Sequence, residues 1–199
     1  MTQVVPPPFI VGILLAAGFS RRFGQQDKLL YPLAHGLSVA ETAGQALLAA
    51  LPNAIAVVRQ ENVALQMHLA RLGYTVIRCE AGDINMADSL RAGVLAAQAN
   101  FPGASGYVIA LADMPFIRPD TIREIAHQLK HAAIVQPTVN SQRGHPVGFS
   151  SRFSNELIAI QGDQGAREVL QAHQNEVLLL PCQDDGILRD IDTLADLAD

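Results

Sequence analysis

Short apolar runs alternate with longer amphipathic segments through the first part of the chain. Runs of this length, bounded by glycine, proline or polar residues, are typical of strands buried on both faces of a sheet. Strands are predicted at residues 9–17, 55–58, 74–77 and 107–111. The segments between them have helical length, and helices are predicted at residues 38–51, 61–72 and 86–99. This alternation predicts a parallel sheet with right-handed crossovers and helices on both faces.

Local signals mark the ends of two of these helices. Ser38-x-x-Glu41 is a capping-box pattern that opens the first helix, and Gly73 ends the second. The inner face of the second helix is expected to hold Val63, Met67, Leu69 and Ala70. A short extended piece is expected at residues 29–33, between the first strand and the first helix.

The second part of the chain carries weaker signals of the same kind. Pro119-Asp120 favours the start of a helix that runs to about residue 131. Further strands are predicted at residues 134–137, 146–149 and 176–180, with short helices at 151–160 and 165–173. A chain of 199 residues with 49% hydrophobic content can bury one core but not two, so we expect one α/β domain over residues 1–199.

Composition excludes several classes of protein. The formal net charge of −5 argues against nucleic-acid binding, because nucleic-acid-binding proteins usually present a broad basic surface. The apolar runs are far shorter than the ~20 residues that span a bilayer, and no leader pattern precedes the first strand, so we expect a cytoplasmic protein without membrane association. Cys79 and Cys182 are the only cysteines, and their spacing suggests neither a disulfide framework nor a zinc site.

The segment after the first strand is dense in small residues and cations. Gly18 and Gly24 let the backbone approach a ligand closely, and Arg21, Arg22 and Lys28 supply the charge that clustered phosphates need. Five residues separate the two glycines and Gly-x-Gly-x-x-Gly is absent, so neither a P-loop nor a dinucleotide fingerprint fits. An ordinary connection with surface cations is disfavoured, because such loops are usually about 2 to 6 residues long.

Asp113 directly follows a predicted strand, in the sequence Leu-Ala-Asp-Met-Pro. Ligands of open α/β sheets bind outside the carboxyl ends of the strands, and both Gly18 and Asp113 follow such ends. A carboxylate that faces phosphates is where Mg²⁺ would be held, with its remaining ligands from phosphate and water. An aspartate that only shapes the turn is the alternative.

A second carboxylate for this site is found near the C-terminus. Alternation places Asp190 and Asp192 on the same side of an extended Asp-Ile-Asp-Thr segment, so either one completes the site, and we favour Asp192. The alternative is a helix cap, since Asp192 or Thr193 is placed to cap a helix over residues 194–198.

Two turn-like segments pair glycine with a cation, which suits an anionic acceptor. They are Arg143-Gly144-His145-Pro146 and Gly162-Asp163-Gln164-Gly165-Ala166-Arg167. A hairpin turn and a helix start explain the same residues, and a histidine bonded to the backbone explains His145, so both interpretations stay open. His127 and His131 lie one helical turn apart, but Gln128 stands where the zinc-protease motif needs glutamate.

Taken together, the motifs resemble those of one family. The L-A-A-G-x-S-x-R-x-G-x-x-K signature of nucleotidyltransferases is matched by Leu15, Ala16, Ala17, Gly18, Ser20, Arg22, Gly24 and Lys28. Further matches in chain order are residues 88–93, 111–115, 143–146, 162–167 and 190–193. From residue 13 to its end the chain resembles the MobA-like nucleotidyltransferases, and within them the molybdenum cofactor cytidylyltransferases.

Two positions in the first loop bear on the branch of this family. The guanylyl branch typically reads L-A-G-G and R-M-G-G, whereas Ala17 and Gln25 occupy the corresponding places here, which favours cytidine. Phe23 replaces the methionine that is usual in the family, a mild departure. The resemblance implies a Rossmann-like three-layer α/β/α nucleotidyltransferase fold with a mostly parallel central sheet. Its nucleotide-binding part would cover about residues 9–118 and its acceptor-binding part about residues 119–199.

The resemblance also implies a reaction and a set of site residues. The reaction is Mg²⁺-dependent transfer of CMP from CTP to the terminal phosphate of molybdopterin or Mo-molybdopterin, with release of pyrophosphate. The implied catalytic residues are Arg22, Lys28 and Asp113, and the implied metal ligands are Asp113 and Asp192. The implied nucleotide-binding residues are Leu15, Ala16, Ala17, Gly18, Ser20, Arg21, Arg22, Gly24, Lys28, Ser89 and Asp113. The implied acceptor-binding residues are Arg143, Gly144, His145, Gly165 and Arg167.

A molybdenum hydroxylase or its chaperone is a further expected partner. Other acceptors and nucleotides stay open: a guanylyl- or adenylyltransferase, or a transferase that acts on a sugar or alcohol phosphate. A non-catalytic cofactor chaperone is the alternative from another class. It is disfavoured because a protein that only binds its ligand could lose the metal carboxylate Asp113.

Overall fold

The computed structural model describes residues 9–18, 23, 27–79, 85–162 and 165–197. The strands are β1 (Ile10–Ala16), β2 (Ala54–Arg59), β3 (Thr75–Cys79), β4 (Gly106–Leu111), β5 (Ile134–Val139), β6 (Gln142–Arg143), β7 (Val147–Ser150) and β8 (Val177–Pro181). The α-helices are α1 (Val39–Ala50), α2 (Val63–Leu72), α3 (Met86–Asn100), α4 (Pro119–Gln128), α5 (Ser154–Ala159) and α6 (Arg167–Ala172). Short 3-10 helices are η1 (Lys28–Leu30), η2 (Ser151–Phe153), η4 (Gln174–Glu176), η5 (Asp185–Leu188) and η6 (Leu194–Leu197).

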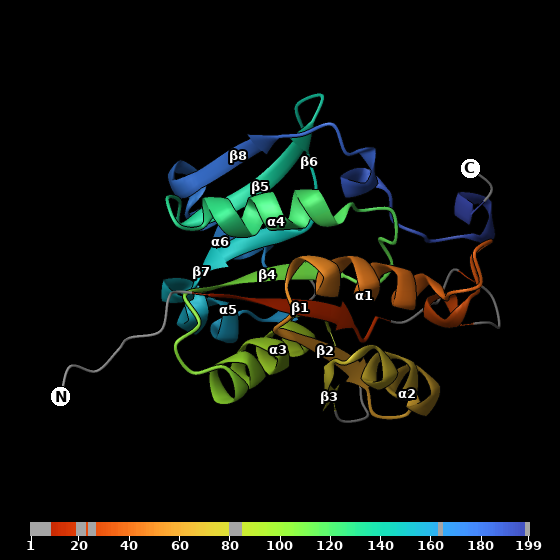
Figure 1. Ribbon diagram of the computed structural model, residues 1–199. Coiled ribbons are helices and arrows are strands. Elements are labelled where there is room, and N and C mark those ends of the chain that lie inside the picture. The colour runs from red at the N-terminus through yellow and green to blue at the C-terminus, as the bar shows by residue number, and fades with distance from the viewer. Residues whose placement is uncertain (1–8, 19–22, 24–26, 80–84, 163–164, 198–199) are drawn as a thin grey trace.

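All the strands join one mixed sheet in the order β3-β2-β1-β4-β7-β5-β6, with β8 also paired to β5 (Figure 1). The strands β3, β2, β1 and β4 are parallel, and β5 is parallel to β8. β7 runs antiparallel to both of its neighbours, β4 and β5. The predicted parallel sheet is therefore confirmed for the first part of the chain, and β7 makes the whole sheet mostly rather than wholly parallel.

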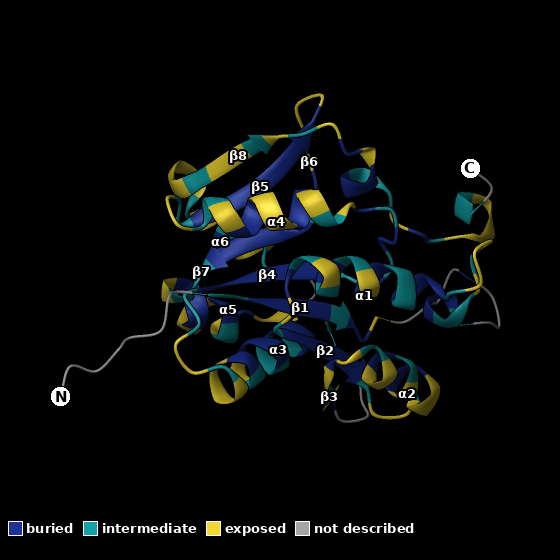
Figure 2. Ribbon diagram, viewed as in Figure 1, coloured by how far each residue is buried: buried dark blue, intermediate teal, exposed yellow. Residues whose placement is uncertain are grey.

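Helices cover both faces of this sheet, because its central strands are apolar on both sides. On one face Leu14 belongs to a core that includes residues of α1, α2 and α4. On the other face the neighbouring Ile13 belongs to a core that includes residues of α3, α5 and α6. Figure 2 shows the central strands buried between these layers. The predicted three-layer α/β/α architecture is confirmed.

α1 begins as its sequence predicts. The Ser38 hydroxyl accepts a hydrogen bond from the Glu41 backbone N–H, and the Glu41 carboxylate accepts one from the Ser38 N–H. Both bonds satisfy donors that the first turn of a helix leaves open. The predicted capping box is present.

The predicted inner face of α2 was wrong at three of its four positions. Val63 is 58% exposed and Met67 is 50% exposed, and Ala70 is also exposed, whereas Leu65 and Leu69 are fully buried. Both sets of residues have helical spacing, so periodicity alone does not choose between them. The side chain of the buried Gln66 donates to the carbonyl oxygens of Arg59 and Gln60, which turns the face of Leu65 and Leu69 inward.

Two further predictions need correction. Residues 29–33 do not form one extended piece, because the chain turns through η1 after Asp27, whose carboxylate accepts a hydrogen bond from the Leu29 N–H. The helix that opens at Pro119 ends at Gln128, and turns follow it to residue 131. β6 was not predicted, since two exposed residues carry no strand pattern.

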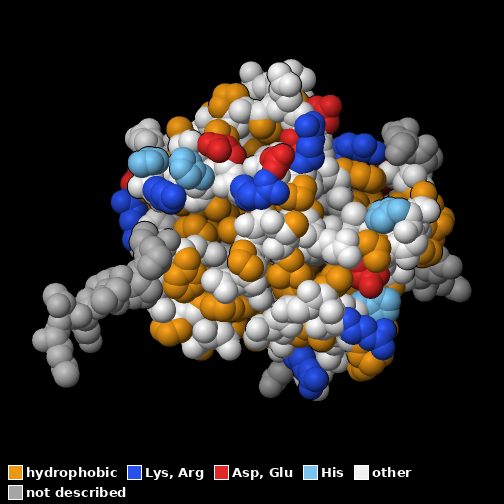
Figure 3. Space-filling view, in the orientation of Figure 1, with side chains coloured by type: hydrophobic (Ala, Val, Ile, Leu, Met, Phe, Trp, Pro, Cys, Tyr) orange, Lys and Arg blue, Asp and Glu red, His pale blue; other side chains and the backbone are white. Residues whose placement is uncertain are grey.

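The outer face of α4 is charged. Asp120, Arg123 and Glu124 are exposed there, and Figure 3 shows acidic and basic side chains interspersed over this side of the molecule. Across the ranges described above, no helix combines the length and apolarity needed to cross a membrane.

Candidate nucleotide and metal site

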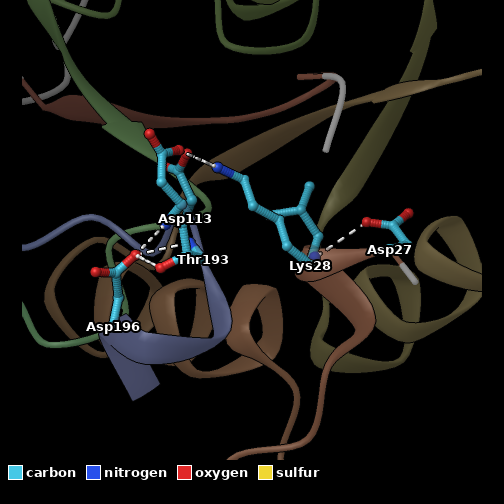
Figure 4. A network of polar contacts seen from close by, with 7 residues as sticks. Asp27, Lys28, Asp113, Thr193 and Asp196 are labelled. Carbon is cyan, nitrogen blue, oxygen red and sulfur yellow. Dashed lines mark hydrogen bonds and ion pairs between the residues drawn. The ribbon is translucent and has the colours of Figure 1, made fainter. Parts of the chain in front are cut away.

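Lys28 joins two carboxylates from distant parts of the chain. Its Nζ atom lies 2.8 Å from Oδ2 of Asp113 and 3.1 Å from Oδ1 of Asp192. Lys28 belongs to η1 and Asp113 to the turn after β4 (Figure 4). Asp192 belongs to the C-terminal segment. Sequence reasoning placed these three residues in one site, and the structure brings them together.

Sheet register places Asp113 beside the first loop. β1 and β4 are parallel neighbours with Leu15 opposite Leu111. The Ala112 N–H donates to the Leu15 carbonyl oxygen at 3.0 Å. The residues that follow these strands, Gly18 and Asp113, therefore leave the sheet at the same edge. This is the edge at which ligands of open α/β sheets bind.

The C-terminal segment is fastened to the same edge. The N–H of the fully buried Ile191 donates to the Asp113 carbonyl oxygen at 2.9 Å. The Asp196 carboxylate accepts hydrogen bonds from the backbone N–H groups of Asp192 and Thr193, at 3.0 and 2.7 Å. These bonds fix the turn that presents the Asp192 side chain to Lys28.

Lys28 is held in its charged form. It is 8% exposed, and burial alone would lower the pKa of its ammonium group, but Asp113 and Asp192 outweigh that effect and raise it. The result is one buried cation between two carboxylates. The three groups carry one net negative charge when both carboxylates are ionised.

The donor set fits a hard divalent cation. Two carboxylates converge on the point that Lys28 Nζ occupies, and carboxylate oxygens are what Mg²⁺ and Mn²⁺ prefer. Within the part of the chain that the structure describes, no group of three or more His, Cys, Asp or Glu side chains could hold a metal ion. A cation at Asp113 and Asp192 would therefore take its other ligands from phosphate oxygens and water.

The first loop is described in part. Leu15 is half-buried and ends β1 together with Ala16, Ala17 is buried, and Gly18 is exposed. A Cβ atom added at Gly18 would meet nothing within 4 Å, so space is open beside it. The predicted residues Ser20, Arg21, Arg22 and Gly24, and Gln25 with them, lie outside the described residues.

Ser89 lies on α3 and is 5% exposed. Its hydroxyl donates to the Asn85 carbonyl oxygen at 3.4 Å, within the first turns of the helix. Burial and Asp88 raise the pKa of the nearby Cys79 thiol at the end of β3, and the Ser89 side chain opposes this effect. The hydroxyl thus has local partners, and its contact with a nucleoside stays a prediction.

Gly144 lies where two segments make close contact. A Cβ atom there would lie 2.4 Å from the Ile187 carbonyl oxygen, so only glycine fits. The His145 N–H donates to the same oxygen at 3.0 Å. Arg143, in contrast, is exposed on β6. Arg143 is thus an accessible cation, while Gly144 and His145 contact the C-terminal segment.

Gly165 and Arg167 lie at the start of α6. Gly165 has a φ of +53°, and a Cβ atom there would lie 2.5 Å from the sulfur of Met86, the first residue of α3. Arg167 is exposed. This contact brings the 162–167 motif beside the helix that carries Ser89.

Sequence reasoning missed two aspartates that support the site. Asp27 accepts hydrogen bonds from the Leu29 N–H and, at 2.5 Å, from the Asn62 side chain at the start of α2. Asp184 is 3% exposed and accepts hydrogen bonds from Arg118, Thr121 and Gly186. The Asp-Asp-Gly sequence at residues 184–186 is a turn signal that could have drawn attention to it.

Comparison with known proteins agrees with this geometry. The MobA-like NTP transferase domain matches residues 12–177. Purine catabolism protein PucB of Bacillus subtilis is 30% identical over 194 residues, covering 94% of this chain and 93% of PucB. Nicotine blue oxidoreductase of Paenarthrobacter nicotinovorans is 26% identical over 196 residues, covering 94% of each chain.

Solved structures give the same result. The crystal structure of Rv0371c from Mycobacterium tuberculosis H37Rv superposes with a TM-score of 0.81 at 28% identity, covering 96% of each chain. A second structure of Rv0371c, in complex with manganese, has a TM-score of 0.78 at 26% identity, again covering 96% of each chain. Since the family match spans most of the sequence and includes the strands and turns that carry Lys28 and Asp113, the chain belongs to the MobA-like NTP transferase family.

Proposed function

We propose that this protein transfers CMP from CTP to the terminal phosphate of molybdopterin or Mo-molybdopterin, with release of pyrophosphate. The observation that carries the proposal is the convergence of Lys28, Asp113 and Asp192 at the carboxyl edge of β1 and β4. This arrangement supplies a cation for phosphate and two oxygen ligands for a divalent metal in one place. Both are what nucleotidyl transfer from a triphosphate needs.

The reaction requires no general base. A phosphate oxygen of the acceptor attacks the α-phosphorus of CTP, the bond between that phosphorus and the oxygen bridging to the β-phosphate breaks, and pyrophosphate leaves. The attacking oxygen is already ionised, so no proton has to be removed. Catalysis then consists of alignment and of charge neutralisation at the α-phosphate and the leaving group.

Among the residues that the structure describes, Lys28 is the one that we propose neutralises this charge. In the structure its ammonium group is paired with Asp113 and Asp192, and it would turn toward the triphosphate when the nucleotide binds. Asp113 and Asp192 would hold Mg²⁺, which supplies Lewis-acid stabilisation of phosphate charge when bound. Arg22 is proposed to act with Lys28 on the triphosphate, from the motif that it shares with the family.

The choice of nucleotide and acceptor rests on sequence. Ala17 and Gln25 differ from the guanylyl pattern, and this supports CTP. Arg143 and Arg167 are both exposed cations, which suits an anionic acceptor. We further propose that residues 9–118 bind the nucleotide and that residues 119–199 bind the acceptor and contact the molybdenum hydroxylase or chaperone that receives the product.

The test is pyrophosphate release by the purified protein with Mo-molybdopterin and Mg²⁺, with CTP, GTP, ATP and UTP supplied separately and the product identified by mass. Turnover with CTP alone supports the proposal. Turnover with GTP would keep the mechanism but overturn cytidine as the donor. The mass of the product distinguishes CMP attached to the acceptor from release of pyrophosphate without transfer.

Two outcomes would point elsewhere. Absence of release with every nucleotide would direct the search to sugar or alcohol phosphates as acceptors, or to a chaperone that binds cofactor without turnover. Because one relative bears the name nicotine blue oxidoreductase, redox activity toward nicotine blue is measured separately on the same preparation. Redox activity without nucleotidyl transfer would contradict the proposal.

A further inference from the structure

Two polar atoms near the candidate site are buried without a hydrogen-bond partner among the described residues. They are Oε1 of Gln136 and Nδ1 of His145. An unpaired buried polar group destabilises the fold, and most buried polar atoms in proteins are paired with protein or ordered water. Two such atoms in neighbouring segments therefore require an explanation.

The two side chains lie beside the same peptide. Gln136 is on β5, and its Nε2 donates to the Gly144 carbonyl oxygen at 3.4 Å. The Gly144 N–H donates in turn to the carbonyl oxygen of Pro137, at 2.9 Å. The amide of Gln136 is therefore held against the peptide that joins Gly144 to His145.

This position adjoins the metal carboxylate. His145 lies close enough to Asp113 and Asp190 for both to act electrostatically on its ring. Its backbone N–H is fixed by the Ile187 carbonyl oxygen, on the segment that continues to Asp192. The unpaired atoms thus lie beside Gly144 and His145, two of the predicted acceptor residues.

Packing within β5 does not explain why a polar residue, Gln136, stands at this buried position. Gln136 is 8% exposed, and the other residues of β5 are buried as well. Ile134, two residues earlier on the same face of the strand, packs in the apolar core. An apolar side chain at position 136 would leave no unpaired oxygen, so the amide oxygen is better explained by a ligand than by packing.

The available groups are uncharged. A glutamine amide offers one acceptor oxygen and two donor hydrogens, and a neutral imidazole offers one donor and one acceptor. Burial lowers the pKa of His145 although Asp113 and Asp190 raise it, and this favours the uncharged ring. Such groups suit the amide-like edge of a neutral heterocycle, whereas the exposed cation Arg143 suits phosphate.

We propose that Gln136 and His145 form a subsite for the heterocyclic ring of the acceptor. For a pterin, the ring presents an N–H donor next to a carbonyl acceptor, which complements the glutamine amide. This inference rests on the proposed function, since the acceptor named there carries a pterin. It adds Gln136, which the sequence did not single out, as the residue that selects the acceptor.

The test uses Gln136→Met, which removes both hydrogen-bonding groups and keeps the length of the side chain. Binding of 6-hydroxymethylpterin, a pterin without phosphate, is measured by fluorescence, and KM is measured for Mo-molybdopterin and for CTP. We expect at least tenfold weaker pterin binding and a similar rise in KM for Mo-molybdopterin, with KM for CTP unchanged. Gln128→Leu on α4 is the matched control, for which no change is expected.

Stability separates a ligand site from a site filled by water. If no ordered water pairs with Oε1 of Gln136 in the free protein, Gln136→Met leaves the melting temperature unchanged or raises it. If a structural water pairs with that atom instead, Gln136→Met lowers the melting temperature and leaves pterin affinity as in wild type. The latter result would overturn the inference, as would absence of pterin binding by the wild-type protein. If Gln136→Met does not fold, His145→Leu is tested with the same measurements and the same expectations.

The two proposals fail in different ways. If the wild-type protein binds the pterin through Gln136 but transfers no nucleotide, the subsite stands and the proposed reaction is wrong. If the wild-type protein transfers CMP and Gln136→Met has the wild-type KM for Mo-molybdopterin, the reaction stands and the subsite is wrong.

Discussion

The Nζ atom of Lys28 lies 2.8 Å from a carboxylate oxygen of Asp113, although 85 residues separate the two in the sequence. Since Asp113 and Asp192 are the proposed metal ligands, Lys28 occupies the place where a cation would bind. A metal ion bound there would therefore compete with Lys28 for the same oxygens until a triphosphate attracted the ammonium group.

Asp113→Asn should abolish turnover. The change keeps the size of the side chain but removes the charge that pairs with Lys28 and would bind the metal, and loss of such a group costs a factor of about 10² to 10³ in kcat. Pyrophosphate release under saturating CTP and Mg²⁺ measures the effect. Asp120→Asn, at an exposed position on α4, is the control and should retain full activity. Undiminished turnover by Asp113→Asn would remove the proposed mechanism.

Lys28→Met should separate metal binding from catalysis. Without the ammonium group the two carboxylates repel each other, so Mn²⁺ should bind about tenfold or more tightly in the absence of nucleotide. Turnover should nevertheless fall, because the charge on the triphosphate is no longer neutralised. Electron paramagnetic resonance of free Mn²⁺ measures the first effect and pyrophosphate release the second. Equal Mn²⁺ affinity in both proteins would show that Lys28 does not compete with the metal.

Much of the fold could be predicted because its signals are local. The apolar run that forms β1 and the Ser38–Glu41 pair that opens α1 each act within a few residues. The position of Asp113 followed from a general property of parallel sheets, that the carboxyl ends of the strands share one edge. Family membership was predicted from the motifs and is confirmed by the match over residues 12–177.

The remaining features depend on contacts between distant segments. The buried face of α2 is set by Gln66, which binds carbonyl groups at the end of β2, and periodicity does not reveal that contact. The contacts of Asp184 and Gln136 form only in the folded chain. Asp184, in the C-terminal segment, accepts from the Arg118 N–H, and Gln136 donates to the Gly144 carbonyl oxygen in the 143–146 turn. Sequence alone shows them as a turn aspartate and a strand glutamine.

Gly144→Ala should impair both stability and activity. The new Cβ atom would lie 2.4 Å from the Ile187 carbonyl oxygen, so the segment that leads to Asp192 must shift. Overpacking of this kind costs about 1–3 kcal/mol, and the displaced Asp192 would weaken metal binding. Urea unfolding gives the first effect, and the Mg²⁺ concentration for half-maximal turnover gives the second. A variant with normal stability and normal Mg²⁺ dependence would show that this contact does not position Asp192.

Glu41 should make stability depend on pH in the acid range. Burial alone would raise the pKa of its carboxyl group, but the N–H and side chain of Ser38, together with His68, outweigh burial and lower the pKa from 4.5. A carboxyl group whose pKa is lower in the folded than in the unfolded chain adds stability above the unfolded pKa, and this stability is lost as the pH falls through the folded pKa.

Glu41→Gln retains a side chain that can close the capping box but cannot ionise. The variant should be less stable than wild type at pH 7, by about 0.5–1 kcal/mol, and the difference should shrink as the pH falls below 4.5. Urea unfolding at pH 7, 5, 4 and 3 measures it, with Glu168→Gln, at an exposed position on α6, as the control. A difference that stays constant over this range would mean that the charge of Glu41 contributes nothing and that the hydrogen bonds alone hold the start of α1. In either case nucleotide transfer at pH 7 should be unchanged, because the Glu41 carboxylate contacts Ser38 and His68 rather than the proposed metal ligands Asp113 and Asp192.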